Sequence, residues 1–244
     1  MNFVVLASGR GSRLNKETAN KPKCLVKIYK NETLLDYISK NFSKHYSNLV
    51  LTGYKSRHIE KHLKYKNVKF IKNKNYLKTN MVESLMLSKK ALKKRGILIV
   101  YGDIFFDKNI LKKLKEIKGN VIPINANWLK SWKKRYKTLE KIKKDAEDLI
   151  VSGEKIISIG NKITKKIPKY QYMGILKLNF SSFIRLQKFY QKLNNKKIGL
   201  TQFIDKAIKS KIAVFKFMPS KDYWYEVDNN KDLSYLKTEI QKLF

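Results

Sequence analysis

Residues 4–14 read VVLASGRGSRL, and residues 21–26 continue this stretch as KPKCLV. An apolar run, which predicts a buried strand, ends abruptly in a loop with two glycines, a serine and two arginines. Glycine lets backbone N–H groups converge on an anion, and fixed cations neutralise the charge of that anion. The stretch therefore predicts a phosphate-binding loop after the first strand.

Two better-known phosphate fingerprints do not fit this loop. Walker A requires Gly-Lys-Ser/Thr, but Gly11 is followed by Ser12 and Arg13, and the dinucleotide motif requires a third glycine where Leu14 stands. A P-loop NTPase and a Rossmann dehydrogenase are therefore not supported. What remains is a loop from which Arg13 and Lys23 can reach a polyphosphate. An ordinary strand-to-helix turn with surface cations is the minority interpretation.

Strands and helices alternate through the first half of the chain. Apolar runs predict strands at residues 2–7, 48–52, 68–71, 97–101 and 120–124, and periodic segments predict helices at residues 34–46, 57–63, 81–94 and 110–117. Thr33 is the expected cap of the first helix, and Thr79 or Asn80 that of the third. This alternation predicts an α/β fold with a mostly parallel, doubly wound sheet and right-handed crossovers.

The pattern changes after residue 125. Residues 128–148 are basic and aromatic without a clean strand, and residues 149–151 and 155–159 flank a predicted hairpin turn. Further strands are expected at residues 172–178 and 212–217, and helices at residues 180–193, 202–210 (capped by Thr201) and 229–244. We expect a single domain over residues 1–244, with a nucleotide-binding half (1–124) and an acceptor-binding half (125–244). An insertion at about residues 125–170 is expected to fold over the sheet edge as a lid.

Charge dominates the composition of the 244 residues. Lysine and arginine number 55 against 19 acidic residues, a net charge of +36. The basic residues are nearly all lysine and are dispersed, which is typical of a solvated surface, whereas a nucleic-acid binder concentrates arginine and aromatics in one patch. A specific nucleic-acid partner is therefore not expected, and a basic nucleic-acid-binding protein is kept as the non-enzyme alternative. The positive field favours anionic small molecules or an anionic membrane surface.

Targeting and redox features are sparse. No apolar run has the length of a membrane span, and no secretory leader pattern is visible, so we expect a cytoplasmic protein without integral membrane contact. Cys24 is the single cysteine, which excludes an internal disulfide and a cysteine-based zinc cluster.

Two aspartates follow apolar runs in a chain that has few acidic residues. Asp103 follows residues 97–101, and Asp228 precedes the last predicted helix. Ligands bind at the carboxyl ends of strands in open α/β sheets, and Mg²⁺ commonly takes one or two carboxylates, so both are candidate metal ligands. Helix or turn capping explains them equally well from spacing alone. His58 and His62 share a helix face, but a solvated face is the favoured interpretation because no third ligand is near.

Together these residues resemble the nucleotide-diphospho-sugar transferase superfamily, in particular its small cytidylyltransferases of the phosphocholine cytidylyltransferase type. The resemblance covers essentially the whole chain. Its motifs are LASGRGSRL (6–14) with Thr18 and KPKCL (21–25), TNMVESL (79–85), YGD (101–103) and WYEVDN (224–229), with DAE (145–147), residues 156–160 and QYMG (171–174) on the acceptor side. Ser8 departs from the pattern, since most members carry Ala or Gly there. The resemblance implies a GT-A-like, Rossmann-like, doubly wound mixed sheet with a small inserted lid or hairpin.

The resemblance also implies a reaction, in which a phosphorylated acceptor attacks the α-phosphorus of CTP and pyrophosphate leaves. It implies catalytic roles for Arg13 and Lys23 and Mg²⁺ ligation by Asp103 and Asp228. The nucleotide-binding residues would be Leu6, Ala7, Ser8, Gly9, Arg10, Gly11, Ser12, Arg13, Lys23, Asn80, Ser84 and Gly102. A sugar-1-phosphate nucleotidyltransferase using UTP or dTTP is the alternative within the enzymes.

The acceptor is less well determined. Tyr172, Trp224 and Glu226 are the expected acceptor-binding residues, and with Trp128 and Trp132 they could form a cation–π cage for a quaternary ammonium. The alternative interpretation is that most of these aromatic residues belong to the core. That arrangement favours phosphocholine, whereas the 171–174 pattern also occurs in relatives that could take phosphoglutamine. Phosphonates and sugar phosphates stay open, as does a homo-oligomeric state. The resemblance implies a role in cell-surface polysaccharide, in capsule or lipopolysaccharide modification.

Overall fold

The computed structural model describes residues 1–164 and 166–243 of the chain. They form two compact units: Met1–Phe105 with the segment from Tyr225 onward, and Phe106–Trp224. The division expected near residue 124 therefore lies inside the second unit. Two short strands, β7 (Ile104–Phe106) and β14 (Trp224–Glu226), lie where the chain passes between the units.

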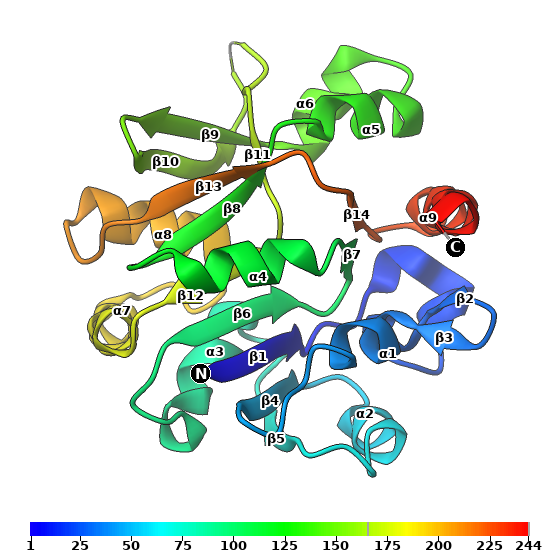
Figure 1. Ribbon diagram of the computed structural model, residues 1–244, viewed down its shortest axis with the longest axis horizontal. Helices are drawn as coiled ribbons and strands as arrows, with labels where there is room; N and C mark the ends of the chain where they lie inside the picture. The colour runs from blue at the N-terminus through cyan, green and yellow to red at the C-terminus, as the bar shows by residue number, and fades with distance from the viewer. Residues whose placement is uncertain (165, 244) are drawn as a thin grey trace. The chain divides into compact units, whose positions relative to one another are not determined.

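The first unit is built on four parallel strands in the order β5-β4-β1-β6 (Figure 1). Their bounds are β1 (Asn2–Ala7), β4 (Ser47–Thr52), β5 (Lys69–Lys72) and β6 (Ile97–Tyr101). All six residues of β1 are buried, as its unbroken apolar sequence predicts for a central strand. The four strands expected in this region are confirmed to within a residue. Because they are parallel, their carboxyl ends meet at one edge.

Short helices connect these strands, and a longer helix near the end of the chain completes the unit. The connecting helices are α1 (Leu34–Ser39), α2 (Ser56–His62) and α3 (Met81–Leu87), and the last helix is α9 (Asn230–Leu243). The unit also has 3₁₀ turns at Ser12–Thr18, Lys23–Leu25 and Ser88–Ala91 and a small hairpin of β2 (Lys27–Tyr29) and β3 (Glu32–Thr33). Helix α3 packs on β1, β4 and β5.

The two expected helix caps in this unit are present, but two helices are shorter than predicted. Thr33 and Asp36 form a capping box on α1, and the Asn80 side chain accepts from the Met81 N–H at the start of α3. Helix α1 ends at Ser39 rather than near residue 46, and α3 gives way at Leu87 to a tighter 3₁₀ turn. Phe244, the last residue of the expected final helix, lies outside the described residues.

The second unit contains a mixed sheet around β8 (Val121–Asn125). This strand pairs parallel with β13 (Lys216–Ser220) and antiparallel with β11 (Gln171–Tyr172) and β12 (Ile175–Leu178), while β10 (Lys155–Lys162) joins β13 to β9 (Glu147–Ser152). The helices are α4 (Asn109–Glu116), α5 (Trp128–Arg135), α6 (Leu139–Asp145), α7 (Phe180–Lys192) and α8 (Leu200–Lys209). The mixed character agrees with the expectation from the resemblance.

Several local expectations for this unit need correction. The strand expected over residues 172–178 is two strands, because Gly174 turns the chain at φ +70°. The strand expected at 212–217 begins only at Lys216. Lys211, just after α8, has φ +57°, so the chain turns there before it becomes extended. Gly199, not Thr201, occupies the N-cap of α8. The predicted hairpin is present, but it extends the edge of the sheet through β13.

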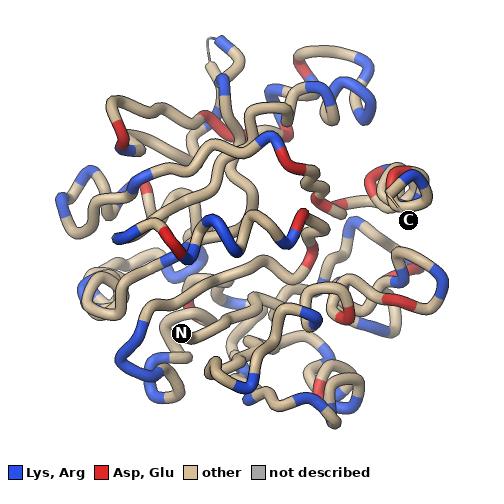
Figure 2. Tube along the Cα trace, viewed as in Figure 1, with Lys and Arg blue, Asp and Glu red and all other residues tan. Residues whose placement is uncertain are grey.

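Lysine and arginine are spread along the elements of both units rather than gathered on one of them (Figure 2). This agrees with the solvated surface inferred from composition. Among the described helices, none combines the length and apolar character needed to cross a bilayer.

Candidate active site

The glycine loop follows β1 directly and brings Lys23 close to the backbone. Gly11 adopts φ +71°, and a Cβ built on it would lie 2.6 Å from Cβ of Lys23. The Thr18 hydroxyl donates to the Gly11 carbonyl at 2.8 Å, and this bond holds the loop closed. Glycine at position 11 therefore allows both the left-handed turn and the passage of the Lys23 side chain.

Lys23 joins the two aspartates that the sequence singled out. Its Nζ donates to Asp103 Oδ2 at 2.7 Å and to Asp228 Oδ1 at 2.6 Å. Arg13 Nη2 lies 2.9 Å from the same Asp228 oxygen. The Lys23 side chain is 12% exposed, and those of Asp103 and Asp228 are 24% and 14% exposed. Four residues from distant parts of the chain thus form one charged cluster in the first unit.

The electrostatics of the cluster are those of a strongly paired cation. Burial of the Lys23 ammonium acts to lower its pKa, but the charges and hydrogen bonds of Asp103 and Asp228 outweigh burial and raise the pKa above its ordinary value. Lys23 is therefore charged at neutral pH. Asp103 Oδ1 is buried and has no hydrogen-bond partner among the described residues.

The same carboxylates have the oxygen donors that a divalent cation such as Mg²⁺ prefers. The unpartnered Asp103 oxygen is a hard donor, and Asp228 supplies a second carboxylate at the same ammonium. No group of three or more His, Cys, Asp or Glu side chains suited to a metal occurs among the described residues. Two carboxylates fit Mg²⁺, which keeps its remaining positions for water and phosphate oxygens. They do not fit structural zinc, which takes four protein ligands.

Beside this cluster is a cavity of about 120 Å³ at the carboxyl ends of the parallel strands, which we call the strand-end cavity. Its walls come from β1, β6, the segment after β5 and the start of α3. The lining residues are Leu6, Ser8, Gly9, Asn73, Tyr76, Thr79, Asn80, Met81, Tyr101 and Asp103. Asp103 thus belongs both to the charged cluster and to this cavity.

Gly102 lines a neighbouring hollow of about 40 Å³ together with Lys23, Cys24 and Asp103. A Cβ on Gly102 would lie 2.8 Å from the Leu6 carbonyl oxygen, the atom to which the Gly102 N–H donates at 2.9 Å. Glycine is therefore required at this close approach of β1 and β6. The close approach places Asp103 beside the glycine loop.

The structure distributes the remaining nucleotide-site candidates unevenly. Leu6, Ala7, Ser8, Gly9 and Asn80 line one or both small cavities. Arg10 instead lies over the Tyr54 ring at 5.6 Å, and Ser12 begins the first 3₁₀ turn.

Ser84 is 1% exposed and lies behind the strand-end cavity. Its hydroxyl donates a hydrogen bond to Ser8 Oγ and accepts one from Asn73 Nδ2, each at 3.0 Å. Ser84 therefore does not line this cavity itself.

Sequence reasoning missed Asn73, which is 1% exposed and follows β5. Asn73 follows the end of β5 much as Asp103 follows the end of β6, and that kind of position made Asp103 a candidate. The available signal was a polar residue directly after a predicted parallel strand.

The acceptor candidates are divided between the units. Tyr172 and Trp224 belong to the second unit and Glu226 to the first. Trp224 is 4% exposed and stacks on Trp132 with ring centroids 5.3 Å apart. The Arg135 guanidinium also lies over the Trp132 ring, at 4.3 Å from its centroid.

Trp128 and Trp132, the expected cage partners, are buried in this cluster. Their indole N–H groups donate to the Pro168 carbonyl at 3.2 Å and to Asp145 Oδ2 at 2.9 Å. Trp132 already has a protein cation over its ring, so these two tryptophans are core residues of the second unit rather than an open cage for a quaternary ammonium.

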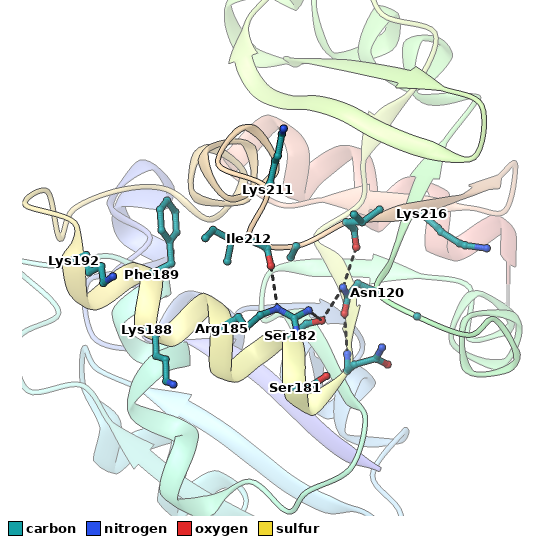
Figure 3. A pocket seen from close by; sticks show the side chains of 14 residues that line it. Asn120, Ser181, Ser182, Arg185, Lys188, Phe189, Lys192, Lys211, Ile212 and Lys216 are labelled. Atoms are coloured by element: carbon teal, nitrogen blue, oxygen red, sulfur yellow. Dashed lines mark hydrogen bonds between the residues drawn. The ribbon is translucent and has the colours of Figure 1, made fainter.

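A larger cavity of about 770 Å³ in the second unit is lined by α7 and by the segment that leads into β13 (Figure 3). Its lining cations are Arg185, Lys188, Lys192, Lys211 and Lys216. Figure 3 shows Lys188, Lys211 and Lys216 directed apart, while the Arg185 and Asn120 side chains both donate to the Ser182 hydroxyl, at 2.9 and 3.0 Å. Diverging cations do not grip a compact polyphosphate, so size alone does not make this cavity the active site.

Another cavity of the second unit, about 850 Å³, brings together two segments noted in the sequence. Asp145, Ala146 and Glu147 line it together with Gly160. Burial raises the pKa of the Glu147 carboxyl, which accepts from the Thr201 hydroxyl at 3.0 Å. These segments are thus neighbours in space within one unit.

The chain is similar to known proteins over nearly its whole length. The family described as "Nucleotidyl transferase" matches residues 2–242. The CTP:phosphoglutamine cytidylyltransferase of Campylobacter jejuni subsp. jejuni serotype O:2 is 30% identical over 262 aligned positions, covering 99% of this chain and 100% of that protein.

Two solved structures share the fold. The inositol-1-phosphate CTP transferase of T. maritima gives a TM-score of 0.74 at 21% identity, covering 99% of this chain and 96% of that one. The CTP:phosphocholine cytidylyltransferase LicC of Streptococcus pneumoniae gives 0.74 at 17% identity, covering 98% of each chain.

Proposed function

Because the chain belongs to the nucleotidyl transferase family, we propose that it transfers CMP from CTP to a small phosphorylated acceptor and releases pyrophosphate. The observation that carries this proposal is the cluster in which Lys23 bridges Asp103 and Asp228 beside Arg13. It combines cations for a polyphosphate with carboxylates for a divalent cation at the glycine loop. The relative that acts on phosphoglutamine with CTP supports the choice of nucleotide.

The chemistry follows from the charges. An oxygen of the acceptor phosphate attacks the α-phosphorus of CTP, the bond from that phosphorus to the bridging oxygen breaks, and the electron pair leaves with pyrophosphate. No enzyme nucleophile is required, because the phosphoryl oxygens of the acceptor already carry negative charge at neutral pH. A phosphate monoester such as phosphocholine, with a second pKa of about 6, is largely dianionic there. The protein positions the reactants in line and neutralises charge.

Arg13, Lys23 and the backbone N–H groups of the glycine loop would hold the triphosphate and stabilise the departing pyrophosphate. Arg13 is 64% exposed and has one carboxylate partner, Asp228, whereas Lys23 is mostly buried and has two. When nucleotide binds, phosphate oxygens would compete with the carboxylates for the Lys23 ammonium.

Asp103 and Asp228 would hold Mg²⁺, which would supply charge neutralisation at the phosphate oxygens. The unpartnered oxygen of Asp103 supports this assignment. In the absence of the cation, the positive charge of Lys23 offsets part of the negative charge of the two carboxylates.

For the acceptor we favour a phosphorylated amino-acid amide of the phosphoglutamine type over phosphocholine. The relative at 30% identity acts on phosphoglutamine. Phosphocholine recognition through Trp132 would require a cation where Arg135 already lies. Contacts from Tyr172, Trp224 and Glu226 stay proposals for this part of the site. We further propose a cytoplasmic reaction that feeds a capsule or other cell-surface polysaccharide.

Pyrophosphate release tests this function. The purified protein is given CTP, UTP or dTTP with Mg²⁺ and, separately, phosphoglutamine, phosphocholine, 2-aminoethylphosphonate or a sugar 1-phosphate. We expect release with CTP and phosphoglutamine above all other pairs. Preference for UTP or dTTP with a sugar phosphate would identify a sugar nucleotidyltransferase instead. Steeply salt-dependent DNA binding without release from any triphosphate would identify a nucleic-acid-binding protein.

The variant Asp103→Ala tests the role of Asp103 in the same assay. We expect turnover to be lost while the circular dichroism spectrum stays that of the parent, because Asp103 is at the site and not in the apolar core. Turnover close to that of the parent would remove Asp103 from the reaction.

A further inference from the structure

Ser8 places a buried hydroxyl in the wall of the strand-end cavity. The residue is 7% exposed and lines that cavity. A buried polar group is costly unless it is hydrogen-bonded, so this hydroxyl calls for an explanation. The bonds behind Ser8 supply one.

Those bonds begin at Asn73, whose amide orientation is fixed. Its Oδ1 accepts from the Asn75 N–H at 2.9 Å, so its Nδ2 must face the other way. Nδ2 donates to Ser84 Oγ and to Thr79 Oγ1, each at 3.0 Å. Both amide protons of this buried side chain are therefore committed to hydroxyl groups.

The direction of the next bonds follows from proton counting. A hydroxyl has one proton. Ser84 Oγ accepts from Asn73, and its proton goes to Ser8 Oγ at 3.0 Å. Thr79 Oγ1 accepts from Asn73 and donates to the Asn75 carbonyl at 2.9 Å. Neither hydroxyl has a proton left for the cavity.

Ser8 therefore stands at the end of a directed chain. Its oxygen accepts from Ser84, and its own proton has no acceptor among the described residues. Because Ser8 lines the strand-end cavity, the direction left for this proton is into the cavity. The chain from Asn73 through Ser84 makes Ser8 a hydrogen-bond donor toward whatever occupies the cavity.

We propose that Ser8 is a specificity-determining residue, whose hydroxyl donates a hydrogen bond to N3 of a cytosine base. Asn73 and Ser84 are positioning residues that set the direction of this bond. The proposal rests on the proposed use of CTP. Cytosine N3 has a lone pair that accepts the proton, whereas N3 of uracil has a proton of its own. A polar group left unpaired opposite the wrong base lowers its affinity.

Equilibrium binding by isothermal titration calorimetry tests this proposal without requiring turnover. CTP and UTP are titrated into the parent protein and into Ser8→Ala, which removes the donor. For the variant we expect CTP affinity to fall about tenfold and UTP affinity to change by less than about twofold, the loss expected for one hydrogen bond. The ratio of the two affinities is the readout, because a general distortion of the site weakens both nucleotides together.

Asn73→Asp tests the donor-to-acceptor direction of the hydrogen bonds that link residue 73, Ser84 and Ser8, because it keeps these bonds but reverses them. An aspartate has no amide protons, so it accepts from both hydroxyls and from the Asn75 N–H. Ser84 then donates to residue 73, Ser8 donates to Ser84, and only lone pairs face the cavity. We expect the CTP/UTP affinity ratio to fall at least as far as in Ser8→Ala. The added negative charge acts on both triphosphates alike and cancels in the ratio.

Ser88→Ala is the matched control, because Ser88 is a fully buried serine in the neighbouring 3₁₀ turn whose hydroxyl donates only to the Leu85 carbonyl. Its affinity ratio should stay that of the parent. Thermal melts establish that each variant is folded before titration.

An unchanged ratio in both Ser8→Ala and Asn73→Asp, with CTP bound by the parent, would overturn the inference and leave the proposed function standing. A fall of the ratio in Ser88→Ala as large as in Ser8→Ala would also overturn it. A parent protein that binds CTP but releases no pyrophosphate with any acceptor would count against the proposed function and not against Ser8.

Discussion

Replacing Lys23 by methionine should lower the stability of the protein, and a divalent cation should then restore it. The Lys23 ammonium makes charge-assisted hydrogen bonds of 2.7 and 2.6 Å to Asp103 and Asp228. Methionine fills a similar volume but leaves two mostly buried carboxylates facing each other. Removal of one partner from a buried ion pair costs about 3–5 kcal/mol.

The structure sets the expected magnitude near the lower end of that range. Arg13 Nη2 still lies 2.9 Å from Asp228, and the Asp103 side chain is 24% exposed, so water and a second cation offset part of the repulsion. We therefore expect a loss of about 3 kcal/mol in the free energy of unfolding. For a chain of this length that loss lowers the melting temperature by about 6–12 °C.

Mg²⁺ should reverse most of this loss in the variant. A ligand at one hundred times its dissociation constant stabilises a folded protein by about 2.7 kcal/mol. In the parent, Lys23 competes with the cation for the same oxygens, so the shift should be smaller. Differential scanning fluorimetry of both proteins, with Mg²⁺ or with EDTA, measures the two shifts.

Lys113→Met provides the control, since Lys113 pairs with Asp222 at 3.0 Å from an exposed position. Exposed pairs contribute little, so its melting temperature should stay close to that of the parent in either buffer. Two results would refute the assignment of Asp103 and Asp228 to a cation site. One is a melting temperature of Lys23→Met equal to that of the parent; the other is an increase of the melting temperature with Mg²⁺ that is the same in the variant and in the parent.

Three further predictions follow from close contacts and buried groups. Gly102→Ala should lower both activity and melting temperature, because the added Cβ would lie 2.8 Å from the Leu6 carbonyl oxygen; unchanged values in both assays would contradict the contact. Asp205→Asn should lower the unfolding free energy in urea titrations by about 1–3 kcal/mol, because Asp205 accepts from Lys209 and from the Ser158 hydroxyl. Burial acts to raise the pKa of Asp205, but these bonds outweigh burial and hold the pKa below its ordinary value. The difference in unfolding free energy between parent and variant should therefore be full at neutral pH and shrink as the pH falls through the lowered pKa of the folded protein; a difference independent of pH would count against the ion pair. Burial raises the pKa of the Cys24 thiol to about 12, so the folded protein should react slowly with iodoacetamide at pH 8 and quickly in denaturant, and equal rates would show that the thiol is exposed.

Patterns that depend on neighbouring residues were readable from the sequence. The apolar run of β1 predicted a buried central strand, and Thr33 with Asp36 formed the expected kind of helix start. Asp103 was expected at a strand end and lies there, next to Gly102. These features follow from burial periodicity and from local hydrogen bonding, which a short stretch of chain expresses by itself.

The errors occur where distant packing overrode local preference. The apolar segment before β13 looked like a strand, but only its last residues pair with β8. The tryptophans of α5 looked available for a ligand, yet Trp132 is enclosed by Trp224 and Arg135. Composition does not distinguish a buried aromatic cluster from a binding cage, because both need the same side chains.

The sequence by itself determined the glycine loop, the strands that lead to it and the two aspartates at strand ends. Only the tertiary structure decided that Lys23 meets Asp103 and Asp228, which lie 80 and 205 residues away along the chain. It also decided that Asn73 and Ser84 form successive hydrogen bonds that lead to Ser8 in the wall of the strand-end cavity. The physical reason is that parallel strands have their carboxyl ends at one edge of the sheet. Residues far apart in the sequence therefore lie close enough there to form ion pairs and hydrogen bonds with one another.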